Sequence, residues 1–324
     1  MARAPSPEHD VQVRKRLLGL AIVVVVGAGG VWYLLGRDTG LVTGDILTQA
    51  RFPAAITVLP DGTIRYSERL TGQVRDVSPN GELASEPVAE VDVSPSGQRG
   101  LLGVAVDEDG RTFASWTRPS DQVLVVGQVA PGEVRIVWEG PETSELNVGG
   151  HIAFDPNGDL VIGIGDLQEP DAVLDASLPN GKVLALDPDG PATQEPRTIS
   201  SGWTNPMAFD FAEDGSLWLA DNASDGGAER LTRGDLDARR YPITQLPEGT
   251  VPSGLAATEE HLFVCGFESR ELLRYRRRGD EAAGRGRVLA TNCSLGVAEL
   301  PDGRLAYSNE GTIFTLDPSS PEGG

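Results

Sequence analysis

A β-hairpin that recurs six times is the feature that most restricts the fold of this chain. Each copy has an alternating apolar strand, an acidic turn that usually contains glycine, and a second alternating strand, which is the pattern of a tight hairpin. The clearest copy lies within Asn147–Asp166, where the turn reads Asp-Pro-Asn-Gly. The six copies occupy residues 56–68, 104–116, 152–164, 207–221, 255–267 and 297–309.

The spacing of these copies predicts the architecture. The turn residues Gly62, Gly110, Gly158, Gly215, Glu260 and Gly303 are separated by 48, 48, 57, 45 and 43 residues. A period of about 40 to 50 residues with several strands in each period is typical of a propeller blade. We therefore predict an all-β, six-bladed β-propeller, in which residues 312–316 and the N-terminal 41–58 region complete one shared blade. A pair of β-sandwiches is the alternative, but it does not explain six evenly spaced copies.

The composition agrees with an all-β chain and excludes some classes of function. Gly 40, Pro 23 and only 6% aromatic residues among 324 favour short strands and tight turns over helices. The formal net charge of −21 argues against a nucleic-acid partner, which would require a basic face. Three histidines, at positions 9, 151 and 261, are too few for a histidine-rich zinc or copper centre.

The N-terminal region predicts a membrane anchor. Residues 17–36 form an uncharged apolar run of 20 residues, which at about 1.5 Å per residue spans the hydrocarbon layer as one transmembrane helix. Three basic residues precede the run and should stay cytoplasmic, while Trp32 and Tyr33 lie near its far end as interfacial anchors. A cleaved signal peptide is the alternative, and a mature chain that starts near residues 38–45 would reveal it.

These boundaries describe a single-pass protein of the cell membrane whose larger part is extracytoplasmic. We expect a cytoplasmic tail over residues 1–16, a linker over 37–50, the propeller over 51–318 and a disordered tail over 319–324.

The only two cysteines, Cys265 and Cys293, fall in the part expected to be exported, where disulfides persist. A bridge between them would close a loop of 28 residues and contribute about 3 kcal/mol on the chain-entropy model. Two unpaired buried thiols are the alternative, because the sequence does not give the Cα separation.

Longer motifs follow one another in order along the propeller: GQRGLLGVAVDEDG, GGHIAFDPNGDLVIGIGD, NGKVLALDPDG and SGWTNPMAFDFAEDGSLWLADNASDGGAER. In this order and spacing the chain resembles the glucose/sorbosone dehydrogenase family. The members of that family are exported six-bladed propellers that use pyrroloquinoline quinone (PQQ), and some bind calcium. The resemblance covers most of the expected propeller, and it implies oxidation of aldose sugars.

Carried over residue by residue, the resemblance implies a site. Gln98, in Gln-Arg-Gly-Leu-Leu-Gly, matches a family position near the cofactor, and Asn205 matches the asparagine of an Arg-Asn-Pro motif. Asp166 matches the carboxylate that orients the family's catalytic histidine, and Asn147 stands where that histidine is found. Glu229, in Gly-Gly-Ala-Glu, matches an acidic residue of the calcium-binding loop.

The departures from the family concern the chemistry itself. Sugar oxidation needs a base that removes the hydroxyl proton, and the neutral amide of Asn147 is not one. His151 lies four residues later, about 13 Å along the strand at roughly 3.3 Å per residue, and cannot stand in for it. Thr204 replaces the arginine of Arg-Asn-Pro, and residues 289–297 show no basic pair for the carboxylates of PQQ.

Each candidate also has a plainer interpretation. Asp166 fits a strand-end carboxylate that accepts from backbone amides, and Asn147 and Asn205 fit loop-capping amides. The loop over residues 221–229 offers oxygen ligands for calcium but also fits an ordinary acidic turn.

Three functions are therefore open. The first is a membrane-anchored, PQQ-dependent sugar dehydrogenase with a degenerate site, and the second is a non-catalytic binding propeller that keeps only the scaffold. The third is a metal-dependent, lactonase-like propeller. The expected partners are the membrane, through the anchor, and a carbohydrate or another envelope protein.

Overall fold

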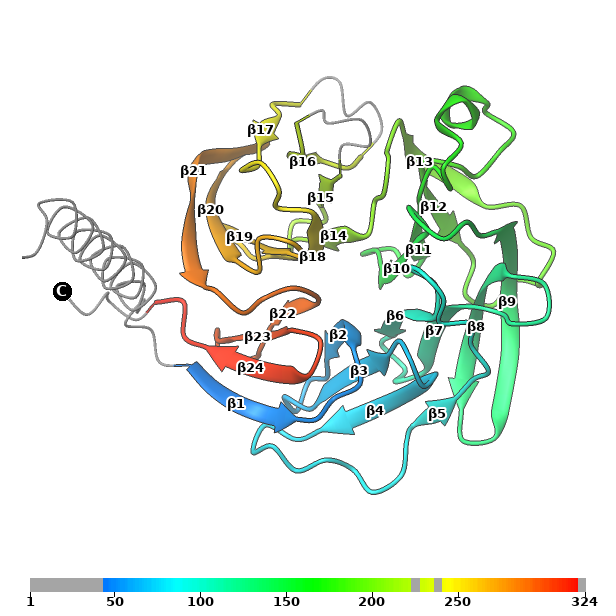
Figure 1. The fold of residues 1–324 in the computed structure, drawn as a ribbon, viewed down its shortest axis with the longest axis horizontal. Coiled ribbons are helices and arrows are strands. Elements are labelled where there is room, and N and C mark those ends of the chain that lie inside the picture. Colours follow the sequence, from blue (N-terminus) through cyan, green and yellow to red (C-terminus); the bar gives the residue numbers. More distant parts are fainter. Residues whose placement is uncertain (1–42, 223–227, 236–240, 320–324) are drawn as a thin grey trace, which may run out of the picture. The chain divides into compact units, whose positions relative to one another are not determined.

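The computed structural model describes residues 43–222, 228–235 and 241–319, which form six four-stranded antiparallel sheets. The sheets are arranged as blades around a common centre (Figure 1), so the predicted all-β, six-bladed propeller is confirmed. Listed from the innermost strand outward, the blades are β2 (Pro53–Val58), β3 (Ile64–Glu68), β4 (Gln73–Val77) and β5 (Ala89–Glu90); β6 (Leu101–Val106), β7 (Thr112–Thr117), β8 (Val123–Ala130) and β9 (Glu133–Glu142); β10 (Gly149–Phe154), β11 (Leu160–Ile164), β12 (Lys182–Leu186) and β13 (Arg197–Ser201); β14 (Ala208–Phe211), β15 (Leu217–Asp221), β16 (Arg230–Arg233) and β17 (Thr244–Gln245); β18 (Pro252–Ala257), β19 (His261–Gly266), β20 (Leu272–Arg278) and β21 (Glu281–Ala290); and β22 (Val297–Glu299), β23 (Leu305–Ser308), β24 (Thr312–Leu316) and β1 (Thr43–Thr48). A short 3-10 helix, η1 (Pro170–Leu174), lies between β11 and β12.

The six predicted hairpins are the inner two strands of the six blades. Their turn glycines, at positions 62, 110, 158, 215 and 303, all have φ between +80 and +86°. In that left-handed region a Cβ atom would clash with the backbone, so glycine is the favoured residue. In the third copy, Oδ1 of Asp155 also accepts from the backbone N–H groups of Asn157 and Asp159, at 2.8 and 2.9 Å. The turn signal in the sequence is therefore a local physical requirement.

The ring is closed by the two ends of the propeller. The innermost strands contact one another in sequence from β2 to β22, and β22 contacts β2. On the outer side, β1 pairs antiparallel with β24 (Figure 1, blue beside red). The shared blade thus takes residues 43–48, which lie in the range expected to be a linker, whereas residues 53–58 begin the next blade as β2. Pairing the two ends in this way covers sheet edges that would otherwise be exposed.

The expected membrane anchor, residues 17–36, lies outside the described residues, as does the end of the chain from residue 320. Within the three described ranges, no helix is both long enough and apolar enough to cross a membrane. The anchor therefore stays a prediction.

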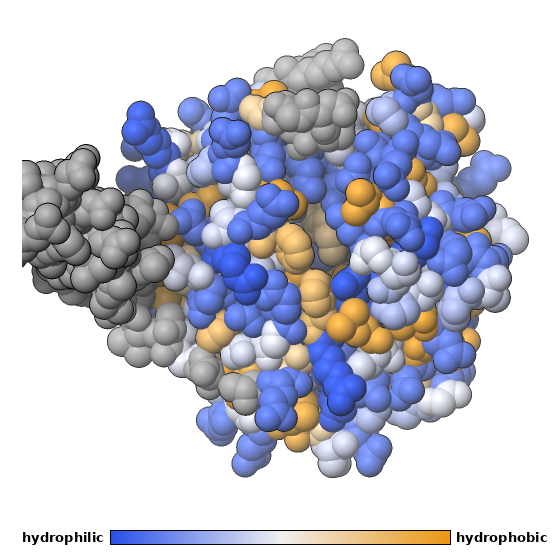
Figure 2. Space-filling model, viewed as in Figure 1, coloured by the Kyte–Doolittle hydropathy of each residue, from blue (hydrophilic) through white to orange (hydrophobic). Residues whose placement is uncertain are grey.

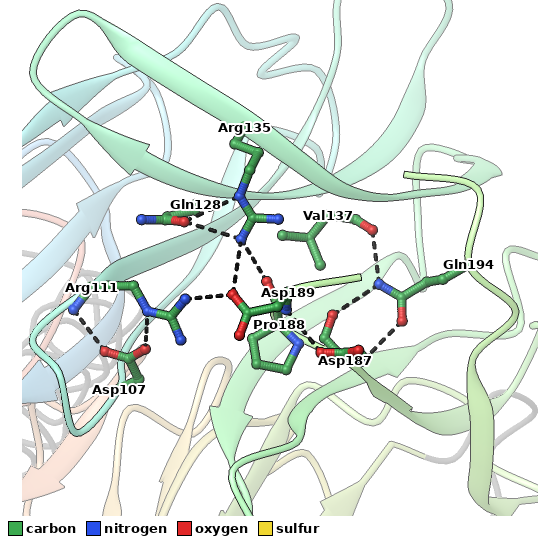
Figure 3. Close-up of polar contacts among 9 residues, drawn as sticks. All are labelled: Asp107, Arg111, Gln128, Arg135, Val137, Asp187, Pro188, Asp189 and Gln194. Carbon is green, nitrogen blue, oxygen red and sulfur yellow. Dashed lines mark hydrogen bonds and ion pairs between the residues drawn. The ribbon is translucent and has the colours of Figure 1, made fainter. Parts of the chain in front are cut away.

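Neighbouring blades pack through apolar layers. Between the second and third blades, for example, Leu102, Phe113, Ile152 and Leu160 are buried in one cluster. Polar contacts join the same two blades farther out (Figure 3). Asp189, in the loop after β12, accepts from Arg111 at 2.6 Å, and the same loop is bonded to β9.

Two hydrogen bonds join the loop after β12 to β9. Arg135 donates to the carbonyl of Pro188 at 2.6 Å, and Gln194 donates to the carbonyl of Val137 at 2.9 Å (Figure 3). The exposed ion pair of Arg111 with Asp189 is of a type that contributes only about 0–1 kcal/mol. The buried apolar layers therefore supply most of the stability, and the polar contacts orient the outer loop.

The two cysteines form a disulfide, so the alternative of two free thiols is not the one the structure shows. Cys265 lies in β19 and Cys293 follows β21 of the same blade, with their Cα atoms 5.2 Å apart. That separation is within the range that a disulfide spans without moving the backbone.

Candidate functional site

All five predicted site residues lie at the blade ends opposite the hairpin turns, and Glu229 is there in the loop between β15 and β16. Gln98, Asn147 and Asn205 precede the innermost strands β6, β10 and β14, and Asp166 follows β11. Each turn joins the end of a first strand to the start of a second, so the loops before first strands and after second strands share the other face. The repeat itself therefore brings these residues together.

Asn147 is the centre of a hydrogen-bonded group on this face. Its backbone N–H donates to Oε1 of Gln98 at 2.7 Å, and its side-chain Nδ2 donates to Oδ1 of Asp166 at 2.9 Å. A carboxylate only accepts, so the amide must present its nitrogen to Asp166. Asn147 has φ of +53°, a conformation that asparagine tolerates better than most residues. The structure thus joins three of the predicted site residues directly.

Asp166 is buried and holds the loop as well as the amide. Its Oδ1 also accepts from the backbone N–H of Gln168 at 2.8 Å, and its own N–H donates to the carbonyl of Thr204 at 2.7 Å. The interpretation as a strand-end carboxylate bonded to backbone is therefore correct in part, because one of the two groups that donate to its side chain is a backbone amide.

Asn205 is buried on the same face, but its contact is with the backbone. Its Oδ1 accepts from the N–H of Gly149 at 2.9 Å, so its side chain ties the third blade to the fourth. Asp221, at the end of β15, fixes this segment, because its carboxylate accepts from the N–H of Asn205 at 2.8 Å and from the N–H of Thr204 at 3.1 Å. Arg230 pairs with the same carboxylate at 2.9 Å. Burial raises the pKa of Asp221, and Arg230 partly offsets this.

From the sequence, Asp221 was expected only as part of the oxygen-rich loop over residues 221–229, and its positioning role was not predicted. A signal was available: Asp221 follows its turn glycine by six residues, and Glu68 follows Gly62 by the same distance. Glu68 likewise accepts from a backbone N–H just ahead of its own blade, that of Arg51, at 3.1 Å. An acidic residue at this repeat position thus clamps the entry loop of a blade.

The centre of this face holds a cavity of about 120 Å³ that is lined mainly by apolar side chains. Phe52, Met207, Phe267 and Leu295 are among them, and Gln98 and Asn205 reach its wall. Figure 2, which shows one face of the ring, has apolar side chains gathered near the centre and hydrophilic ones around the rim. Such a cavity favours an apolar occupant.

Arg69 is the cationic residue of this cavity within the described residues, and nothing in the sequence pointed to it. Its guanidinium lies 4.1 Å from the ring centroid of Phe52 and donates to the carbonyls of Gly97 and Arg99, at 2.6 and 3.0 Å. It therefore holds the loop that carries Gln98. Its Nε is buried without a hydrogen-bond partner, and burial lowers the pKa of Arg69.

Glu229, the predicted calcium ligand, lies apart from the group around Asn147. Its Oε1 accepts from the N–H of Val251 at 2.9 Å, while its Oε2 is buried without a partner. Burial raises the pKa of Glu229, and the nearby charge of Glu268 adds to the effect. Oδ1 of Asn222 is also buried and unpartnered. Residues 223–227 of the same loop lie outside the described residues, and the described ones contain no cluster of three metal-ligating side chains.

His151 is a packed residue of β10. Its ring meets that of Phe209 edge-on, with the centroids 4.7 Å apart. Burial lowers the pKa of His151 to about 4. It takes no part in the group around Asn147.

Comparison with known proteins places this geometry in a family. The model of the glucose/sorbosone dehydrogenase family matches residues 50–232, more than half of the chain, which hold the first three blades and most of the fourth. The chain belongs to the glucose/sorbosone dehydrogenase family.

Solved propellers of this family superpose on the whole described ring. The PQQ-bound aldose sugar dehydrogenase of Streptomyces coelicolor is 23% identical, with a TM-score of 0.72, over 86% of this chain and 98% of that one. The soluble aldose sugar dehydrogenase of Escherichia coli is 20% identical, with a TM-score of 0.73, over 86% and 99%. At these identities the likeness establishes the shared fold.

A curated relative carries a different name. The mouse Hedgehog-interacting protein is 26% identical over 191 residues, which are 48% of this chain and 27% of that protein. The human protein of the same name matches equally. The chain thus spans about a quarter of the length of the curated relatives it matches.

The central cavity does not fit PQQ. Small-molecule sites usually enclose about 300–1,000 Å³, and this cavity has about 120 Å³. Three carboxylates on the quinone would meet one guanidinium among the described lining residues, and Arg69 already donates to two carbonyls. An unpaired carboxylate in such a site is strongly unfavourable. We therefore derive no oxidation step from this site.

Proposed function

We propose that this member of the glucose/sorbosone dehydrogenase family is a non-catalytic binding propeller. The observation that carries the proposal is the contact between Asn147 and Asp166, in which an amide donates to the carboxylate at 2.9 Å. At the position of the family's base, the side chain is thus a hydrogen-bond donor that has no basic lone pair on its nitrogen. Proton removal from a hydroxyl needs a group whose pKa lies near the working pH.

We propose further that the central cavity receives one apolar or aromatic side chain of a protein partner. A cavity of about 150 Å³ is known to hold benzene, and this one is slightly smaller, at about 120 Å³. Phe52 and Phe267 offer aromatic surface around it, and the buried Nε of Arg69 lacks an acceptor. The name of the Hedgehog-interacting protein, a relative over 48% of this chain, supports a protein as partner. The chain would present this face outside the cytoplasm on the anchor at residues 17–36, and the Cys265–Cys293 disulfide supports an oxidising compartment.

Calcium binding by the loop before β16 belongs to the same proposal. Oδ1 of Asn222 and Oε2 of Glu229 are buried oxygens without partners, and calcium prefers oxygen ligands. Calcium should raise the melting temperature of the protein, and Glu229→Gln should abolish that rise. An equal rise in the Glu229→Gln protein would remove Glu229 from the site.

The first test of the non-catalytic proposal is reconstitution of the full chain, in detergent, with PQQ and calcium. We expect no cofactor absorbance on the protein and no dye reduction with a panel of aldoses. The Asn147→His variant, which restores the family's base, should stay inactive because the cavity still lacks space and cations. Quinone bound at micromolar concentration with sugar-dependent dye reduction would overturn the proposal. Metal-dependent hydrolysis of lactones would favour the lactonase-like alternative.

The second test addresses the cavity directly. Toluene and indole, as substitutes for aromatic side chains, should perturb the NMR signals of the Leu295 methyl groups, which line the cavity, at millimolar concentration. Met207→Trp, which fills the cavity from its wall, should abolish the effect of both probes. Perturbation that persists in Met207→Trp would place the probes elsewhere and contradict the assigned docking point.

A further inference from the structure

A second, larger cavity lies at the rim, between the first blade and the outer strand of the shared blade. Its volume is about 330 Å³, and it is lined by Leu47 and Gln49 on one side and by Tyr66, Glu68, Gln73 and Arg75 on the other. Tyr66 lies opposite Arg75, and Glu68 opposite Gln73, in the register of β3 and β4. Side chains two apart in a strand point to the same face, so these four project together into the cavity.

Two buried hydrogen-bond donors in this wall lack partners. The hydroxyl of Tyr66, a side chain with 0% exposure, has none, and neither has Nε of Arg75. Burial raises the pKa of Tyr66, so its hydroxyl stays protonated and able to donate. The other nitrogens of Arg75 donate to neutral acceptors, Oε1 of Gln73 at 3.0 Å and the carbonyl of Ala84 at 2.9 Å. A buried donor without an acceptor costs about 1–3 kcal/mol, so this wall favours a ligand that brings oxygen acceptors.

The same wall also carries an acceptor that disfavours an anion. The carboxylate of Glu68 is buried, and its two oxygens accept from the N–H of Arg51 at 3.1 Å and from the hydroxyl of Thr71 at 2.9 Å. Each carboxylate oxygen can accept a second hydrogen bond. Arg51 and Arg75 of the lining would attract a bound anion, but the anion would also be repelled by Glu68 and by a chain with a formal net charge of −21. A hydroxyl group, in contrast, accepts from Tyr66 or Arg75 and donates to Glu68.

We propose that this rim cavity is a binding site for a neutral polyhydroxy compound of the size of a mono- or disaccharide. Neighbouring hydroxyls match the mixed wall of donors and acceptors, and the amides of Gln49 and Gln73 extend it. The volume of about 330 Å³ is at the lower end of the range for small-molecule sites, about 300–1,000 Å³. The site is separate from the central cavity, whose lining shares none of these residues. It therefore does not depend on the function proposed above.

The test is saturation-transfer NMR on the full chain, with glucose and trehalose as neutral probes and glucuronate and acetate as anionic ones. We expect saturation transfer to at least one neutral sugar and a weaker signal from both anions. Tyr66→Phe, which removes one hydroxyl, should weaken sugar binding by about tenfold. The same variant should not destabilise the sugar-free protein, because the hydroxyl it removes has no partner.

Two controls locate the signal. Tyr275→Phe is the matched control, since the hydroxyl of Tyr275 is also buried and unpartnered but does not line this cavity, so sugar binding should be unchanged. Met207→Trp, in the central cavity, should also leave the sugar signal unchanged. A signal that Met207→Trp removes and Tyr66→Phe keeps would assign the sugar to the central cavity and overturn the proposal. No sugar signal at millimolar concentration would mean that the cavity holds ordered water only, and a stronger signal from the anions would refute the choice of ligand class.

Discussion

The carboxylate of Asp210 provides the sharpest test of how burial acts in this propeller. Asp210 lies in β14 and accepts from the backbone N–H groups of Phe211 and Ala257, at 2.8 and 2.9 Å. Burial, with a contribution from the charge of Glu299, raises the pKa of Asp210 from 3.8 to about 7. The folded protein therefore keeps this proton to a higher pH than the unfolded chain does. Stability should fall as the pH rises from about 4 to about 7.

The magnitude follows from the shift. About three pKa units at about 1.4 kcal/mol each give about 4 kcal/mol. The effect of the two backbone donors is already part of that shift, and we expect about 2–4 kcal/mol because the residue keeps some exposure to water. Asp210→Asn removes the titration. The difference in free energy of unfolding between variant and wild type should therefore rise in favour of the variant by that amount between pH 4 and pH 8.

The assay is urea denaturation of both proteins across this pH range. Using the difference between the two proteins removes the titration of all other groups, including that of His151, which changes stability with pH in the opposite direction. Asp214→Asn is the matched control, because Asp214 is more exposed, pairs with Arg277 and has a lowered pKa. Its difference from wild type should be flat above pH 4. A flat difference for Asp210→Asn as well would refute the reasoning that burial controls this group.

Three further predictions concern the buried polar groups and the disulfide. Burial lowers the pKa of His151 to about 4, so the free energy of unfolding should fall by about 2–3 kcal/mol as the pH falls from about 6.5 to about 4. His151→Phe should remove this acid sensitivity in urea titrations. Asp221→Ala leaves two backbone N–H groups and the guanidinium of Arg230 without their acceptor, so it should lower the free energy of unfolding by about 3–5 kcal/mol. Asp221→Asn should lower it by less than half as much. Replacing both cysteines by alanine should cost about 3 kcal/mol, and a loss below about 1 kcal/mol would show that the bridge matters little.

The fold was predictable because its determinants are local. A turn glycine with φ near +80° and an alternating pattern on both sides specify a hairpin without reference to the rest of the chain. Six repeats then specify the blade number. The strand that pairs with β24 was harder to predict, because residues 43–48 and 53–58 both lie in the N-terminal region expected to complete the shared blade. Only ring closure decides which of them joins the C-terminal strands.

For the candidate site, the sequence predicted which residues take part but not the contacts between them. The sequence, through the family resemblance, named Gln98, Asn147, Asp166 and Asn205, and the structure places all four on one face. Their contacts could not be predicted, since each bond joins loops that lie 19 to 56 residues apart in the chain. Arg69 carried no chemical signal in the sequence, because its role depends on reaching two carbonyls of a neighbouring blade.

The sequence by itself determined that this chain forms a ring of six blades, and the family resemblance implied that an amide, Asn147, stands at the position of the family's base. Only the tertiary structure decided what that amide does, namely donate to Asp166 at 2.9 Å. It also decided that the central cavity is small and mainly apolar and that a larger polar cavity lies at the rim. The physical reason is that strand pairing follows from neighbouring residues, whereas the volume and polarity of a cavity depend on side chains brought together from distant blades.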